Sequence, residues 1–266
     1  MTSTLTQFDT PRNHILSGVP DEELDLVLSM LEPVELSQGQ VLIETDRAIE
    51  HVYFPENALV STLGAGDGAT AVEVSMIGRD GMVGLPLFLG VDRTQLRAQV
   101  QIAGTGWRMS AEHLRALSYQ SGPLERILRR YAHASFFFAA QSSACHRLHN
   151  VMQRCARWLL TTQDLVGSPQ FRITHLALAQ MLGVRRATIT ETAGMLQRSE
   201  LIAYNRGSVR IVDRNGLEKV SCSCYDVIRS ERERSLPSRE HGALELARVP
   251  ARARTVGGDA SSDLRG

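Results

Sequence analysis

The chain lacks the apolar segments that membrane and secreted proteins carry. No apolar run approaches the ~18 residues of a membrane-spanning helix. Residues 1–10 are polar and contain no apolar core of a signal peptide. The sequence therefore predicts a cytoplasmic protein without a membrane partner. Its 266 residues, 43% of them hydrophobic, are enough for two globular domains.

Recognisable catalytic motifs are also absent. The sequence has no Gly-rich phosphate loop, no paired carboxylates at catalytic spacing and no Ser–His or Cys–His arrangement. His146 and His149 lie three positions apart but have no evident third ligand. We therefore predict that the protein is not an enzyme.

Cysteine is scarce and confined to the second half of the chain. The four cysteines are Cys145, Cys155, Cys222 and Cys224, too few for a disulfide framework in a chain of this length. Cys222 and Cys224 could bind a metal or respond to redox conditions, but two cysteines without a nearby second pair make an incomplete zinc site. We favour two buried or half-buried thiols and predict no metal site.

Net charge is missing from the chain as a whole, but it is unevenly distributed. The 29 basic and 29 acidic residues cancel. Between Arg147 and Arg210, nine arginines and no lysine stand against Asp164, Glu191 and Glu200, a net charge of +6 that leaves −6 elsewhere. This asymmetry is typical of a nucleic-acid-binding module joined to another domain, whereas a solvated helical surface usually mixes Lys and Glu.

Residues 173–190 have the pattern of two short helices joined by a tight turn. Ala179 lets the helices cross closely, and Gly183 supplies a turn conformation that a Cβ would resist. The apolar side chains expected between the helices are Leu178, Leu182, Val184 and Ile189. The second helix, around Arg185–Arg198, is predicted to lie in the major groove of DNA. The side chains predicted to read bases are Arg185, Arg186, Thr188 and Thr190.

A short β-hairpin is expected directly after that helix. Residues 201–204 and 208–212 alternate in polarity, and residues 205–207, Asn-Arg-Gly, are a turn signal. A helix-turn-helix followed by a hairpin is a winged helix. The side chains expected to contact phosphate or to lie on the wing are Thr174, which also caps the first helix, Arg206, Ser208 and Arg210.

Short β-like runs recur between residues 18 and 110. They are Val41–Ile43, His51–Phe54, Leu59–Leu63, Ala71–Ile77 and Gln99–Ile102, with turn clusters at 64–68 and 78–81. Runs of this length and spacing predict an antiparallel sandwich or roll. An acidic helix start at residues 20–23 predicts a helix before the first of them.

A long helix is expected from about Gly122 to Arg147, beginning with Pro123 in its first turn. Its stripe at steps of three and four is Leu124, Ile127, Tyr131, Ala134, Phe138, Gln141 and Cys145. A helix of about 26 residues would span roughly 39 Å, more than one small domain needs. We predict that the stripe packs against its copy in a homodimer. The alternative is a helix buried within one chain, and residues 136–138, three phenylalanines, show that a second face is apolar.

In this order of parts the chain resembles the Crp/Fnr transcriptional regulators over roughly residues 15–225. The stretches that carry the resemblance are Gln38–Leu42, Val52–Phe54, Gly78–Gly84 and, most specifically, Leu178–Thr190. The resemblance implies an α+β fold: a cyclic-nucleotide-binding-like antiparallel β-roll over 15–118, a dimerisation helix over 119–147 and a winged helix-turn-helix over 148–228. It also implies a sequence-specific regulator that binds a two-fold promoter site in double-stranded DNA as a homodimer, with RNA polymerase as a candidate partner. From composition, residues 229–266 are predicted to be a disordered tail, with a short helix around 243–248.

The recognition helix departs from the usual family pattern. The family often presents Arg, Glu and a second Arg, whereas this chain has Arg186, Ala187 and Glu191. A different half-site is therefore expected, with Arg186 still able to read guanine. Thr192 stands where an apolar residue normally anchors the helix, so Ala193, Met195 and Leu196 are expected to supply that anchor.

The region that corresponds to the cyclic-nucleotide cassette of the family departs further from the family pattern. Nucleotide-binding members of the family hold the phosphate with Gly-Glu in one turn and Arg-Ser/Thr-Ala at the start of the next strand. Here Leu85 stands at the Glu position, and Gln95 and Leu96 at the Arg and Ser/Thr positions; a shifted alignment onto Arg97 still lacks the Glu. A phosphate buried there would be poorly paired, at a cost of several kcal/mol. We predict that the protein does not respond to cyclic AMP, and its effector stays unknown.

The iron–sulfur cluster and the haem that other members of the family use as sensors are also not favoured by the sequence. An iron–sulfur cluster is not expected, because no cysteine precedes Cys145. Haem would need an axial ligand such as His51, His113 or His133, and a lone histidine is more often structural. Two alternatives stay open: a constitutive DNA binder controlled by its own abundance, and a roll with a winged helix that binds a protein instead of DNA.

Overall fold

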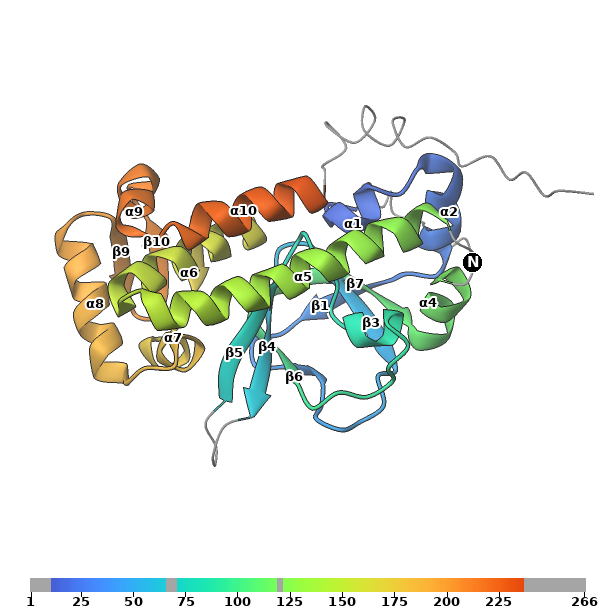
Figure 1. Ribbon diagram of the computed structural model, residues 1–266, viewed down its shortest axis with the longest axis horizontal. Coiled ribbons are helices and arrows are strands. Elements are labelled where there is room, and N and C mark those ends of the chain that lie inside the picture. Colours follow the sequence, from blue (N-terminus) through green and yellow to red (C-terminus); the bar gives the residue numbers. More distant parts are fainter. Residues whose placement is uncertain (1–10, 66–70, 119–121, 237–266) are drawn as a thin grey trace, which may run out of the picture.

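The computed structural model describes residues 11–65, 71–118 and 122–236. Figure 1 shows a long central helix, α5 (Pro123–Leu148), lying along an N-terminal β region and reaching a C-terminal helical region. The predicted α+β order of antiparallel roll, long helix and winged helix-turn-helix is confirmed. Among the described residues, no helix combines the length and apolar character needed to cross a membrane.

The N-terminal roll consists of two antiparallel sheets, with strand orders β1-β7-β3 and β2-β6-β4-β5. Its strands are β1 (Glu32–Leu36), β2 (Val41–Ile43), β3 (His51–Pro55), β4 (Leu59–Ala65), β5 (Ala71–Ile77), β6 (Arg97–Ile102) and β7 (Gly104–Ser110). All five predicted runs are strands. The sequence interpretation missed β1 and β7, because Pro33 interrupts the first and two glycines the second.

Four short helices accompany the roll: α1 (His14–Ser17), α2 (Asp21–Ser29), α3 (Leu85–Phe88) and α4 (Ala111–Ser118). The acidic start at residues 20–23 predicts α2 correctly. Asn13 fixes α1 to the roll from a fully buried position. Its Oδ1 accepts from the backbone N–H of Ile15 at 3.0 Å, and its Nδ2 donates to the carbonyls of Pro55 and Gly81, each at 2.9 Å. One side chain thus satisfies both a helix end and two carbonyls of the roll, one at the end of β3 and one in the turn after β5.

Helix α5 has the predicted length of 26 residues and the predicted proline in its first turn. The prediction that its apolar stripe faces a second subunit is wrong. Leu124, Tyr131, Ala134, Phe138 and Cys145 are buried within the chain itself, against the roll and the C-terminal region. The face that points outward carries small and polar residues around Phe136, whose exposed fraction is 74%. Periodicity identified the helix but could not tell which partner covers its apolar face.

The C-terminal region contains four helices around a small sheet and a fifth that returns toward the roll. The helices are α6 (Val151–Val166), α7 (His175–Leu182), α8 (Arg186–Arg198), α9 (Arg214–Val220) and, returning toward the roll, α10 (Cys224–Ser235). The strands of the sheet are β8 (Gln170–Arg172), β9 (Ile202–Asn205) and β10 (Ser208–Ile211). Helix α6 begins with a capping box, in which Asn150 and Gln153 each accept from the other's backbone N–H.

The predicted disordered tail is wrong in its first residues. Residues 229–235 belong to α10 and are not disordered; the helix expected around 243–248 lies outside the described residues. Figure 1 shows α10 beside α5, directed back toward the roll. His133 of α5 contacts Glu231 at 2.9 Å, and Arg232 pairs with Asp80 of the roll. Composition suggested disorder because α10 is rich in charge. Glu231 and Arg232 have partners in α5 and the roll, and Arg229 and Arg234 pair with acidic residues of α10 itself.

The turn after β5, residues 78–82, joins four parts of the molecule. The N–H of Arg79 donates to the carbonyl of Leu165 in α6 at 3.1 Å, and the hydroxyl of Tyr131 in α5 donates to the carbonyl of Met82 at 3.0 Å. The ion pair between Asp80 and Arg232 adds α10. The roll is therefore tied to the helices of the C-terminal region through one short turn.

The hydrophobic core crosses the predicted domain boundaries. Leu59, Leu63 and Met76 of the roll belong to the same buried cluster as Ile189 and Leu196 of α8. A second cluster fills the roll and includes Leu236 after α10. The two regions therefore bury apolar side chains against each other as well as within themselves.

Glu73 of β5 lies at this shared core and is buried. Its carboxylate accepts from the indole N–H of Trp158 in α6 at 2.8 Å and from the hydroxyl of Ser61. Burial raises the pKa of Glu73 to about 7; the two hydrogen bonds and the nearby Arg157 oppose that rise only in part. A titrating carboxyl group thus sits between the roll and the C-terminal region.

Candidate nucleic-acid interface

The helix-turn-helix has the geometry that the sequence predicts. Thr174 caps α7, its hydroxyl accepting from the N–H of Ala177 at 3.1 Å. Helix α7 ends at Gly183, whose φ of +62° is the left-handed conformation that glycine adopts most easily. Helix α8 begins immediately after Arg185, which has an extended backbone. The short turn leaves the first residues of α8 at the surface.

The four predicted base-reading residues lie together at the start of α8. Arg185, Arg186 and Thr190 are exposed, and Thr188 is half-buried. Within the described part of the chain, neither arginine pairs with a carboxylate, so both guanidinium groups remain available to a ligand. The hydroxyl of Thr190 donates to the carbonyl of Arg186 at 3.1 Å and also lies 3.1 Å from Nδ1 of His175. Thr190 is therefore held by its own helix and by α7.

The inner face of α8 explains the unusual Thr192. This residue is buried with Ile189, Ala193 and Leu196, and its hydroxyl donates to the carbonyl of Thr188 at 2.8 Å. The hydrogen bond satisfies the one polar group on this face. The expectation that Met195 helps to anchor the helix is wrong, because its exposed fraction is 39%.

The predicted wing is present as β9 and β10. Its turn contains Arg206 and Gly207 with φ of +46° and +78°, as a two-residue hairpin turn of primed type requires. Arg206 is exposed at a left-handed position that usually costs a side-chain-bearing residue about 1–2 kcal/mol. Arg210 is exposed and Ser208 half-buried on one face of the wing.

Two further residues of this surface escaped the sequence interpretation. Arg172 of β8 is exposed and pairs in register with Ser208, so it extends the basic face of the wing. His175 stacks on Tyr204 of the wing with ring centroids 4.3 Å apart, and burial together with Arg186 lowers its pKa. Strand β8 has three residues, too few for an alternation signal, and a lone histidine gives none.

The arginine excess of residues 147–210 is only partly on this surface. Arg154 and Arg157 of α6 are buried, with exposed fractions of 9% and 3%. Arg154 donates to the carbonyl of Leu182 at 3.1 Å and so completes the end of α7. Counting charge along the sequence therefore overstated the charge that a ligand meets.

The residues weighed for an effector are dispersed. Leu85 and Leu96 are half-buried, Gln95 is exposed, and Arg97 lies 3.5 Å from Glu44 at the surface. The three histidines considered for haem lie on separate elements: His51 on β3, His113 on α4, and His133 on α5 beside Glu231. These positions bring no group of charged side chains together inside the roll.

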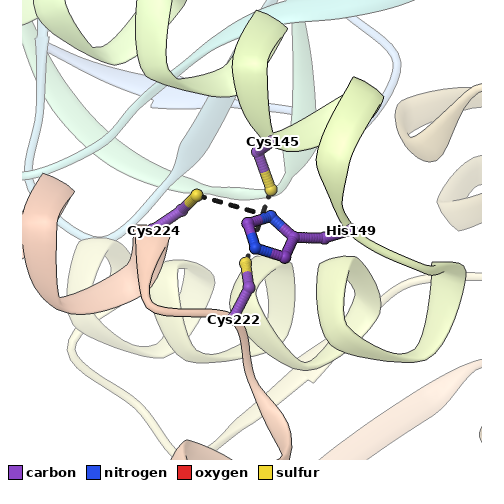
Figure 2. A group of neighbouring side chains, drawn as sticks. All are labelled: Cys145, His149, Cys222 and Cys224. Atoms are coloured by element: carbon purple, nitrogen blue, oxygen red, sulfur yellow. Dashed lines mark hydrogen bonds between the residues drawn. The ribbon is translucent and has the colours of Figure 1, made fainter.

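The structure does bring Cys222 and Cys224 together with Cys145 and His149, at the junction of α5 and α10 (Figure 2). The sequence interpretation weighed Cys222 and Cys224 without a second pair, and His149 only with His146, because Cys145 and His149 lie more than seventy residues before Cys222. Cys155 of α6 is buried outside this group. Burial raises the pKa of Cys155 to about 12, whereas the hydrogen bond with Cys222 lowers that of Cys145.

The model of the Crp-like helix-turn-helix domain family matches residues 153–220, which contain most of α6, both helices of the motif, the wing and α9. The chain has a Crp-like helix-turn-helix domain. This Crp-like domain includes every predicted base-reading and wing residue. No curated protein sequence matches the chain.

Solved structures show that the Crp-like domain belongs to a complete Crp/Fnr-like fold. A Crp/Fnr-family transcriptional regulator from Eubacterium rectale is similar over 76% of this chain and 94% of its own, with 17% identity and a TM-score of 0.59. FixK2 from Bradyrhizobium japonicum is similar over 73% and 98%, with 13% identity and a TM-score of 0.62. A CooA mutant from Carboxydothermus hydrogenoformans is similar over 82% and 98%, with 13% identity and a TM-score of 0.56. The resemblance to the Crp/Fnr regulators is thus confirmed, by sequence in the Crp-like domain and by fold over about three quarters of the chain.

Proposed function

We propose that the protein is a sequence-specific, double-stranded-DNA-binding transcriptional regulator of the Crp/Fnr type that acts as a homodimer. The observation that carries this proposal is the pair of exposed, unpaired arginines at the start of α8 within a Crp-like helix-turn-helix. Arg185 and Arg186 are exposed at the start of α8, and the start of a recognition helix is the part that enters the major groove. Arg186 could bind O6 and N7 of guanine together. Thr188 and Thr190 complete the base-reading face.

Phosphate contacts on either side of α8 would fix its register. On the α7 side, Thr174 is exposed at the start of that helix. On the wing side the available groups are Arg172, Arg206, Ser208 and Arg210. Phosphate contacts position a protein on DNA without reading sequence, and their number sets how steeply affinity falls with salt.

Selection of bound duplexes from a randomised pool, followed by sequencing, tests the proposal directly. The wild type should enrich a two-fold motif with half-sites about one helical turn apart. Arg186→Ala should bind the selected duplex about five- to 150-fold more weakly and lose the preference at one base pair of each half-site, since a bidentate arginine–guanine contact contributes about 1–3 kcal/mol.

Arg93→Ala is the matched control, because it removes the same charge from an exposed position in the roll, away from α8. Salt titration adds an independent readout. Affinity for the selected duplex should fall steeply with salt through counterion release. Enrichment of no motif, together with salt-insensitive binding to a protein partner, would favour the alternative of a protein-interaction module.

The proposed dimer uses the outward face of α5. Phe136 is the large apolar side chain on this face, and Ala140 and Ser143, one and two turns further on, are exposed and small enough for a second helix to approach closely. Two copies related by a two-fold axis would pair the same face and place two α8 helices on successive half-sites.

Phe136→Glu is expected to convert the dimer to a monomer, because it places a charge on each side of the apolar contact. Sedimentation at micromolar concentration measures the change in mass. Affinity for a two-half-site duplex should fall with it, while thermal stability of the monomer should change little, since Phe136 is mostly exposed. A variant that still sediments as a dimer would exclude this face as the interface; Arg126→Glu, exposed near the start of α5, is the control for charge alone.

We propose further that cyclic AMP is not the effector. Leu85 and Leu96 offer a phosphate no hydrogen bond, and Arg97 already has Glu44 as its partner. Cyclic AMP should therefore leave both the melting temperature and the affinity for the selected duplex unchanged. Regulation then comes from another effector or, in a constitutive binder, from the amount of protein present.

A further inference from the structure

Four potential metal ligands from two distant segments converge at the junction of α5 and α10. Cys145 lies in the last turn of α5, His149 directly after it, Cys222 between α9 and α10, and Cys224 at the first residue of α10. Their ligand atoms, three Sγ and one imidazole nitrogen, all lie within 4.8 Å of one another. Figure 2 shows the four side chains directed toward a common centre, two from the end of α5 and two from the start of α10.

The separations of the ligand atoms match a single tetrahedral ion. Zinc–sulfur and zinc–nitrogen bonds of about 2.3 and 2.05 Å place two sulfurs about 3.8 Å apart, and a sulfur and a nitrogen about 3.6 Å apart. Sγ of Cys145 lies 3.4 Å from Sγ of Cys222, and Sγ of Cys224 lies 3.6 Å from Nδ1 of His149. Small side-chain shifts would bring all four atoms to bonding distance.

The surroundings suit an anionic site. Three thiolates and a neutral imidazole around Zn²⁺ carry a net charge of −1. Arg157 is buried, two of its guanidinium nitrogens have no hydrogen-bond partner, and it acts electrostatically on both Cys145 and Cys222. The side-chain amide of Gln141 donates to Sγ of Cys224 at 3.1 Å. Such outer contacts stabilise thiolate ligands and orient them.

We propose that Cys145, His149, Cys222 and Cys224 bind one zinc ion as a closed structural site of the Cys₃His type. All four positions are filled by protein, which leaves no open position for a substrate or water. The three cysteines are buried and His149 is half-buried, so the ion would be shielded but reachable for exchange. The site lies outside the DNA-contacting surface of α8 and the wing.

The placement of the ligands gives the ion a definite role. One pair precedes the Crp-like domain of residues 153–220 and the other follows it, so the ion joins the two ends of that domain. It also joins α5 to α10, the two helices that lead back to the roll. Zinc would thereby fix the direction in which the DNA-binding domain leaves α5, and loss of zinc would loosen it.

The test uses full-length protein purified without metal-chelating resin or chelators. Elemental analysis should find about one zinc per chain in the wild type and in Cys155→Ala, whose cysteine is equally buried but lies outside the cluster. Cys222→Ser and Cys145→Ser should lose nearly all of it. His149→Cys should retain zinc, since a fourth thiolate replaces the imidazole, whereas His149→Ala should bind it more weakly.

Cobalt provides a readout that survives poor folding of a cysteine variant. Apo wild type titrated with Co²⁺ should develop the visible absorption of a tetrahedral thiolate site, and Zn²⁺ should abolish it. Zinc-loaded wild type should melt at a higher temperature than the chelated protein, with no such difference in Cys222→Ser.

Three results would overturn the proposal. The first is reduced wild type that takes up neither metal. The second is a Cys145–Cys222 disulfide, seen as a mass loss of two hydrogens, that persists in protein prepared with reductant and zinc. The third is bound iron with acid-labile sulfide, which would identify an iron–sulfur cluster in place of a single ion. None of these results bears on DNA selection, so this inference and the proposed function can fail independently.

Discussion

Replacing Glu73 by glutamine is expected to stabilise the protein by about 3 kcal/mol at pH 8 and by far less at pH 5. Burial between β5 and α6 raises the pKa of this carboxyl group from 4.5 to about 7. Below pH 4.5 the group is protonated in both the folded and the unfolded chain, so it costs nothing. As pH rises from 4.5 through 7, only the unfolded chain ionises freely, and the wild type loses stability until both states are ionised.

Glutamine avoids that loss because it is neutral at every pH and fits the same partners. Its Oε1 can accept from Trp158, and its Nε2 can donate to the hydroxyl of Ser61. Urea unfolding at half-unit intervals from pH 4.5 to 8.5 measures the difference between the two proteins. Glu35→Gln, at an exposed position of β1, is the control. A Glu73→Gln difference that is the same at pH 5 and pH 8 would rule out a titrating group at this position.

Gly78→Ala is expected to lower the free energy of unfolding by about 3 kcal/mol, near the upper end of the range for overpacked sites. A Cβ at this position would lie 2.6 Å from Cβ and 2.9 Å from the carbonyl oxygen of Leu165. These atoms are fixed by helix α6, so the turn itself would have to move. The adjacent hydrogen bond from the N–H of Arg79 to that carbonyl would lengthen as a result.

Chemical denaturation measures the loss, and Gly194→Ala supplies a control of opposite sign. Gly194 lies inside α8, where an added Cβ meets only the mobile end of Arg198, so alanine should stabilise that helix by up to about 1 kcal/mol. Equal stability of Gly78→Ala and the wild type would mean that the contact between the turn and α6 is loose in solution.

Local patterns in the sequence predicted most of the fold and the helix starts and turns that shape the candidate DNA-binding surface. The caps at Thr174 and Gly183, the turn at Arg206–Gly207 and the length of α5 all depend on neighbouring residues, and all are present as predicted. The predicted base-reading positions rest on the same signals, because the start of a recognition helix is set by the turn before it.

Features that depend on distant partners could not be read in this way. The apolar stripe of α5 does not show whether the roll or a second subunit covers it. The charged residues of α10 do not show that Asp80 and His133 are their partners in the folded chain. The cysteine group could not be predicted from the sequence, because Cys145 and Cys222 are 77 positions apart and the Crp-like domain lies between them. Arginine counts along the chain likewise ignored the burial of Arg154 and Arg157.

The buried cluster that contains Leu63 and Met76 of the roll with Ile189 and Leu196 of α8 bears on how the protein melts and how it can be dissected. Regions that share a core lose it together, so unfolding should be a single cooperative transition rather than two. A winged helix cut out at residue 148 would expose the apolar surface that now contacts β4 and β5. Exchange of DNA specificity between relatives is therefore more safely made by transplanting the surface residues of α8 and the wing than by joining whole domains.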